Sequence, residues 1–184
     1  ELVSNVAVGI AFYAILHPSK GMLNAFLSLI VNSKVKIGWL TDTRLAIWSC
    51  IGVDVWKGLG TSVVIYLAGI QSINRSYFEA AALCGASKWQ NIRHVTIPLC
   101  AAATNLNIIL SFIGGLWSFD LIYCLTSGGP GYATDVFAST IYKQYAAGYY
   151  GLATAGNVIL LVIIAALIFP LRSVLEKQEE KAME

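Results

Sequence analysis

Residues 144–171 read QYAAGYYGLATAGNVILLVIIAALIFPL and contain no Lys, Arg, Asp or Glu. Residues 94–119 form a second uncharged run, and residues 2–19 form a third, shorter one. A helix needs roughly 20 mostly apolar residues to cross a bilayer, so the two longer runs can each span a membrane. The chain is only 12% charged, whereas a soluble domain carries about 25% charged residues. The sequence therefore predicts an all-α integral membrane protein with a polytopic helical bundle.

Four spans are predicted from the apolar stretches and the prolines that interrupt them: 2–16, 45–73, 96–125 and 149–171. Proline cannot continue a helical hydrogen-bond ladder, so His17-Pro18 is expected to end the first span and Pro170 the fourth. Within the polar connector that follows the first span, residues 22–31 are a candidate short helix at the membrane interface. Because the chain begins at Glu1 and enters an apolar stretch at once, we expect an incomplete first span and missing N-terminal spans.

Several classes of protein are excluded by what the sequence lacks. The net charge is +2 and the basic residues are scattered, which argues against nucleic acid. No G-x-x-x-x-G-K-[ST] motif is present, so the chain is not a nucleotide-binding subunit. The cysteines have no C-x-x-C spacing and no neighbouring His, so they predict free thiols and no metal site; they are Cys50, Cys84, Cys100 and Cys124. With no catalytic arrangement around either His, we expect neither an enzyme nor a bound cofactor.

A polar segment between the second and third spans carries the most specific pattern. Residues 76–98 read SYFEAAALCGASKWQNIRHVTIP. Two capping boxes are predicted, from Ser76 with Glu79 and from Ser87 with Gln90. Gly85 stands between the two helices, where a left-handed turn ends the first one. The segment therefore predicts a helix, a glycine turn and a second helix, suited either to docking on a soluble partner or to an ordinary interfacial hairpin.

The spacing of this segment resembles the EAA loop of ABC importer permeases. The resemblance rests on Glu79-Ala80-Ala81, on Gly85 and on the ending Val95-x-Ile97-Pro98. Ser87, inside the loop, is a further candidate residue for coupling. In that family the loop is cytoplasmic and inserts into a cleft of the ATP-hydrolysing subunit. The resemblance implies one permease domain over residues 1–184, with a cytoplasmic coupling loop at 74–95 and a cytoplasmic tail at 172–184. Counts of Lys and Arg on the two sides favour this sidedness only weakly.

Two further stretches are similar to the carbohydrate-uptake branch of that family, which includes the maltose and glycerol-phosphate permeases. They are LAGIQSI at 67–73 and FDLIYCLTSGGP at 119–130. Asn74 is a departure, because that branch often has proline there. The resemblance implies half of a sugar path in the bacterial inner membrane. It also implies a second permease subunit, two ATP-binding subunits that use ATP, and an extracytoplasmic solute-binding protein as partners.

Charged residues inside the second span are candidates for the solute path. Asp54 and Lys57 share a helical face, and a charge in the membrane core costs roughly 2.5–3.5 kcal/mol on insertion scales. They are interpreted either as a structural ion pair or as groups that hydrogen-bond sugar hydroxyls. The resemblance places the family's pocket at Asp54, Lys57, Gly58 and Thr61 on this span and at Ser111, Gly115 and Ser118 on the third.

Two other functions stay open at this point. The same fold can carry a different solute, such as glycerol phosphate or an amino acid. An ion-coupled secondary transporter would instead use Asp54, Lys57 and Asp120 as a relay. Asp120, near the outer end of the third span, is otherwise expected to make a hydrogen bond at the helix end.

Overall fold

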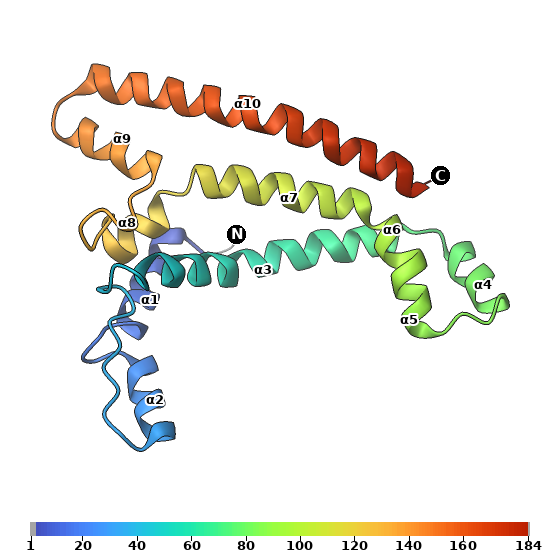
Figure 1. Ribbon diagram of the computed structural model, residues 1–184, viewed down its shortest axis with the longest axis horizontal. Coiled ribbons are helices and arrows are strands. Elements are labelled where there is room, and N and C mark those ends of the chain that lie inside the picture. Colours follow the sequence, from blue (N-terminus) through green and yellow to red (C-terminus); the bar gives the residue numbers. More distant parts are fainter. Residues whose placement is uncertain (1–2, 184) are drawn as a thin grey trace. The chain divides into compact units, whose positions relative to one another are not determined.

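The computed structural model describes the backbone of residues 3–183 and the side chains of residues 3–177. Within these residues the regular structure is helical and contains no strand (Figure 1), which confirms the all-α prediction. The chain forms two compact units, Glu1–Leu59 with Leu116–Leu161 and Gly60–Gly115 with Val162–Glu184. The ends of the predicted first span and tail, at residues 1–2 and 184, lie outside the described residues.

Within residues 3–183, two helices are long and apolar enough to cross a membrane, α3 (Ala46–Ser72) and α10 (Tyr150–Met183). A third span results if the bent pair 88–99 and 101–116 is counted as one. Four spans were predicted, and part of the difference lies in α1 (Asn5–Ile15). Its 11 residues measure about 16 Å at 1.5 Å per residue, roughly half of a bilayer core.

The predicted third span is interrupted twice. The chain bends by 61° at Cys100, after a π-helical turn, η1 (Ile92–Thr96), and the short α6 (Ile97–Leu99). Pro98 in α6 lacks the N–H that a helix requires, and the N–H of Ile97 donates to the carbonyl of Ile92 instead of to that of Arg93. The second interruption, at 117–119, separates α7 (Ala101–Leu116) from α8 (Asp120–Thr126).

The helices near the C-terminal end also differ from expectation. Pro170 was predicted to end the fourth span, but α10 continues through it to Met183. A proline removes one N–H donor, and the bonds on either side of it hold the helix together. The loop after α8 contains the unpredicted α9 (Phe137–Ala146). The fully buried Ser139 donates to the Asp135 carboxylate over 2.8 Å and accepts from the N–H of Val136 over 3.0 Å, which fixes the start of α9.

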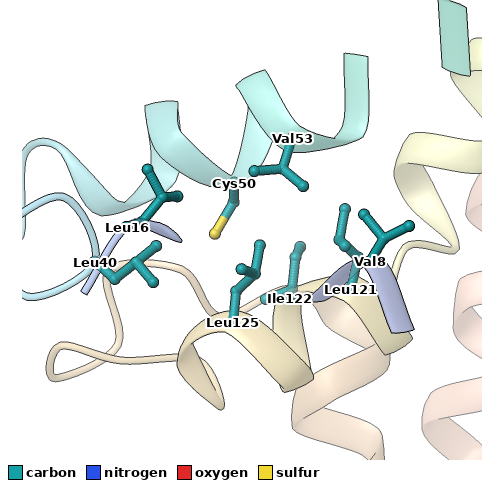
Figure 2. Packing of buried hydrophobic residues seen from close by; sticks show 8 residues of the cluster. All are labelled: Val8, Leu16, Leu40, Cys50, Val53, Leu121, Ile122 and Leu125. Atoms are coloured by element: carbon teal, nitrogen blue, oxygen red, sulfur yellow. The ribbon is translucent and has the colours of Figure 1, made fainter. Parts of the chain in front are cut away.

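The core of the first unit lies where α1, α8 and the first half of α3 meet. Figure 2 shows its buried side chains, which are Val8, Leu16, Leu40, Cys50, Val53, Leu121, Ile122 and Leu125. Gly9 on α1 allows the closest approach, because a Cβ added there would lie 2.6 Å from the Cβ of Cys124 on α8. Small residues let apolar helices pack at short range in this way.

In the second unit, the last part of α3 packs on α7, and α7 packs on the end of α10. A Cβ added to Gly69 would lie 2.7 Å from the Cβ of Ala103, so α3 and α7 are close at this level. The side chain of Asn105 on α7 donates over 3.1 Å to the carbonyl of Leu175 on α10. This unit also carries the polar segment between the predicted second and third spans, which Figure 1 shows beyond the end of α3.

Candidate functional site

The first helix of the polar segment is α4 (Arg75–Leu83), and Asn74 caps its start. The side-chain oxygen of Asn74 accepts from the N–H of Ser76 over 3.0 Å. The predicted capping box of Ser76 with Glu79 is therefore wrong, since the helix begins two residues earlier than that box requires. Asparagine is among the best N-cap residues. Asn74, where the carbohydrate-uptake branch often has proline, therefore fixes the start of α4.

The turn after α4 is built around Gly85, as predicted. Its φ of +73° is left-handed. The N–H of Ala86 donates to the carbonyl of Ala81 and the N–H of Gly85 to that of Ala82, both over 3.0 Å. This pair of bonds is a Schellman motif, which satisfies carbonyls that the end of a helix leaves free. A Cβ at Gly85 would meet nothing within 4 Å, so the backbone angle, and not crowding, requires glycine here.

The second helix of the segment, α5 (Lys88–Asn91), begins at the predicted capping box. The Ser87 hydroxyl accepts from the N–H of Gln90 over 3.3 Å, and the N–H of Ser87 donates to the Gln90 side chain over 2.8 Å. α5 runs directly into η1 and α6, where Pro98 lies. The predicted order of helix, glycine turn and helix is confirmed, with the second helix continued by the π-helical turn.

The outer surface of this segment is exposed. No residue of α4 is buried, and Tyr77, Leu83 and Trp89 are all exposed. Glu79 lies 3.7 Å from Arg75 with both side chains in solvent, so the pair contributes little to stability. Ala80 is exposed and Ala81 is half-buried. A rigid hairpin that presents apolar and charged groups together is suited to binding a protein.

Lys57 is part of a polar chain that links three helices of the first unit. Its ammonium donates to the side-chain oxygen of Asn5 on α1. The side-chain nitrogen of Asn5 in turn donates over 3.4 Å to the carboxylate of Asp120, the first residue of α8. The Asn5 amide thus connects a cation to an anion at the place where the third predicted span is interrupted. The expected hydrogen bond of Asp120 at a helix end is present.

Asp54 lies one turn before Lys57 on α3, yet the two do not form an ion pair among the described residues. Asp54 is exposed, and Lys57 is half-buried against α1. Of the two interpretations of this pair, the structural ion pair is the one that the geometry does not support. Asp54 has its carboxylate available for a solute or a partner chain.

The other candidate path residues lie on α3, on α7 and just after α7, and all but one of them are exposed. In the first unit, Gly58 is exposed and Ser118 is half-buried. In the second unit, Thr61, Ser111 and Gly115 are exposed. A Cβ added to Gly58 or Gly115 would meet nothing within 4 Å. Neither glycine is therefore explained by packing within the described part of the chain.

Asn5 was not among the residues singled out from the sequence. The signal for it is an amide in the uncharged run 2–19, where an unpaired polar group is costly. Its partners Lys57 and Asp120 are 52 and 115 residues away along the chain. No local sequence pattern therefore predicts these contacts.

Residues 2–178 match the family described as binding-protein-dependent transport system inner membrane component. A probable ABC transporter permease protein of Pyrococcus horikoshii is 35% identical over 82% of this chain and 52% of its own length. The trehalose/maltose transport system permease protein MalF of Thermococcus litoralis is 34% identical over 79% of this chain and 50% of its own. The chain therefore spans about half the length of these relatives.

The fold is also similar to that of solved structures. A chain of a bacterial ABC transporter involved in the import of the acidic polysaccharide alginate matches 95% of this chain with a TM-score of 0.81 and 28% identity. That match covers 61% of the alginate transporter chain. A second crystal structure of a bacterial alginate ABC transporter contains a periplasmic protein bound to an alginate pentasaccharide, and it matches with a TM-score of 0.77, 29% identity and 92% and 59% coverage.

Proposed function

This chain belongs to the family of binding-protein-dependent transport system inner membrane components, and from this premise we propose that it is a permease subunit of an ATP-driven sugar importer. The importer would lie in the bacterial cytoplasmic membrane. The observation that carries the proposal is the hairpin at residues 74–95, with its Schellman turn at Gly85 and its exposed surface. The chain itself performs no chemistry in this proposal; ATP is hydrolysed by a partner.

The hairpin would couple ATP hydrolysis to transport. Its two helices begin at the caps Asn74 and Ser87, and Gly85 fixes the turn between them. A force on α4 would therefore move the whole hairpin instead of bending it. The continuous path from α5 through η1 and α6 leads into α7. Motion of two ATP-binding subunits would thereby reach the membrane helices, and spans of this chain would alternate the path between the two sides.

Half of the solute path would be formed by α3 and α7, and a second, related permease subunit would supply the other half. Asp54 offers an exposed carboxylate, which is a strong acceptor for sugar hydroxyls. Gly58, one turn after Asp54 on α3, and Gly115 at the end of α7 each leave space of their own, because nothing lies within 4 Å of the position that a Cβ would take. Hydroxyl groups are added by Thr61 on α3, by Ser111 on α7 and by Ser118, two residues after the end of α7.

The cargo class is supported by relatives named for sugars, the trehalose/maltose permease and a probable starch degradation products permease of Thermoanaerobacterium thermosulfurigenes. The alginate transporter likewise takes a polysaccharide, in that case an acidic one. An extracytoplasmic solute-binding protein is the expected donor, as a periplasmic protein accompanies one alginate transporter structure.

Purification of the full-length subunit from its native membrane in mild detergent, followed by mass spectrometry, tests the assembly. The expected result is an ATPase subunit and a second EAA-loop permease in the same complex. The complex is then reconstituted in vesicles with the co-purified binding protein and a panel of radiolabelled sugars. Uptake that requires ATP and survives an uncoupler supports the proposal. A chain that transports alone, driven by an ion gradient, contradicts it.

A further inference from the structure

The short helix α2 (Met22–Val31) has its polarity reversed relative to an ordinary surface helix. Met22, Phe26, Leu29 and Ile30 lie on one side and are between 60% and 81% exposed; we call them the outer face of α2. The opposite side carries Asn24, which is buried, and Ser28, which is half-buried. A helix in water turns its apolar stripe inward, so this arrangement requires apolar surroundings for the outer face.

Hydrogen bonds lock α2 in this orientation. The side-chain nitrogen of Asn24 donates to the carbonyls of Pro18 over 3.0 Å and of Ile37 over 2.9 Å, and its oxygen accepts from the Trp39 indole over 2.9 Å. The Ser28 hydroxyl accepts from the N–H of Val35 over 3.0 Å. Rotating the outer face inward would break all four bonds. The exposure of the apolar residues is therefore a fixed property of the fold.

The same segment places α2 beside the end of a membrane-spanning helix. The carbonyl of Trp39 accepts from the hydroxyl of Ser49, in the first turn of α3, over 2.8 Å. Figure 2 shows Leu16 and Leu40 packed against Cys50, also near the start of α3. The segment that holds α2 is thus tied to the start of α3, a helix long and apolar enough to cross a membrane. Trp side chains such as Trp39 collect where spans meet the membrane interface.

The residues around α2 carry only positive charge. Lys20 precedes the helix, Lys34 and Lys36 follow it, and all three are exposed. From residue 2 to residue 41 the sequence contains no Asp or Glu. An interfacial helix with an apolar face and basic flanks is the arrangement that binds a membrane surface, and lysines near the surface are attracted to anionic headgroups.

We propose that α2 is an interfacial anchor, whose outer face enters the lipid leaflet in which α3 begins and whose flanking lysines bind anionic phospholipid headgroups. The four apolar side chains contact the acyl chains, and Lys20, Lys34 and Lys36 contact phosphates. The proposal rests on the chain being a membrane protein and does not depend on the cargo or on the coupling partner.

Photocrosslinking tests the lipid contact. The full-length subunit, within its complex, carries p-benzoylphenylalanine in place of Leu29 and is reconstituted in vesicles of phosphatidylcholine and phosphatidylglycerol. After illumination, the expected product is a phospholipid adduct found by mass spectrometry. The matched control replaces Leu83, an exposed leucine of α4, which is expected to give no lipid adduct. A crosslink from position 29 to a protein subunit, or no adduct at all, overturns the proposal.

The composition of the adduct tests the role of the lysines. Phosphatidylglycerol is expected to be enriched in the adduct at least about fivefold over its share of the vesicle. The combined variant Lys20→Gln, Lys34→Gln and Lys36→Gln should still form a lipid adduct but lose the enrichment. Lys177→Gln, a control for loss of positive charge far along the chain, should keep it. An adduct that matches the bulk composition in the unaltered protein refutes headgroup selection, even if the apolar contact is present.

Discussion

Gly85 has a backbone φ of +73°, an angle that a β-branched residue adopts only with strain. Gly85→Val should cost about 1–2 kcal/mol in the Schellman turn, so we expect uptake to fall by roughly five- to thirtyfold. Membrane insertion should be unchanged, because the turn lies outside the spans. Uptake into vesicles, normalised to the amount of protein in the membrane, measures the effect.

The control for this change is Gly85→Asn, since asparagine tolerates left-handed angles better than other residues with a side chain. Most of the uptake should remain in that variant. Equal losses in the two variants would mean that the side-chain volume matters and that the turn conformation is not the cause.

Asn5 holds the ammonium of Lys57 in place and donates to Asp120. Asn5→Leu leaves both charged groups without this amide, and we expect the free energy of unfolding to fall by about 1–3 kcal/mol. Thermal unfolding in detergent, followed by intrinsic fluorescence, gives the shift in Tm. In the double variant Asn5→Leu with Lys57→Met, the loss should be smaller than the sum of the single losses. Additive losses would show that the two side chains do not interact.

Asp54 is exposed and has no polar partner within the described part of the chain. Asp54→Asn should therefore change stability by less than about 0.5 kcal/mol. If its carboxylate accepts from the solute, the KM for uptake should rise at least about tenfold, which corresponds to a hydrogen bond to a charged group. Asp42→Asn, in the connector before α3, is the control and should leave KM unchanged. An unaltered KM in Asp54→Asn would remove this residue from the solute path.

At the scale of elements, we expect opposite results from replacing the two serines of the coupling hairpin by alanine. Ser87 caps α5 through a capping box, whereas Ser76 lies inside α4 behind the Asn74 cap. Ser87→Ala should destabilise the start of α5 by about 1 kcal/mol. Hydrogen exchange of the amides from 88 to 92 should then be roughly fivefold faster. Ser76→Ala should leave exchange in α4 nearly unchanged, and comparable effects in both variants would contradict the capping assignment.

The elements that the sequence predicted correctly are those that depend on interactions between residues close together in the sequence. The helix at 22–31, the glycine turn and the capping box at Ser87 each depend on hydrogen bonds between residues at most five positions apart. The errors share a different cause. Ser76 and Asn74 are both good N-cap residues, so the sequence alone did not decide which of them begins α4. Pro170 did not stop α10, because a long apolar helix tolerates the loss of one hydrogen bond.

At the scale of the whole molecule, composition was enough to predict a helical membrane protein but not the course of its spans. The interruption at 117–119 follows Gly114-Gly115, and such a pair of glycines is compatible with a continuous helix as well as with a break. The chain from Lys57 through Asn5 to Asp120 joins residues that are far apart in sequence, so it emerges only from the packed helices. The structure of the hairpin was predictable because all of its residues are contiguous.

α10 has 34 residues and measures about 51 Å at 1.5 Å per residue. The hydrocarbon core of a bilayer is about 30 Å thick, so roughly 20 Å of this rod extends past it, even with a moderate tilt. The uncharged run of α10 ends at Leu171, and six of the twelve residues from 172 to 183 are charged. The last turns of the helix, beyond the contact of Leu175 with α7, are therefore expected to extend past the hydrocarbon core, where a soluble protein can reach them without any opening of the membrane part.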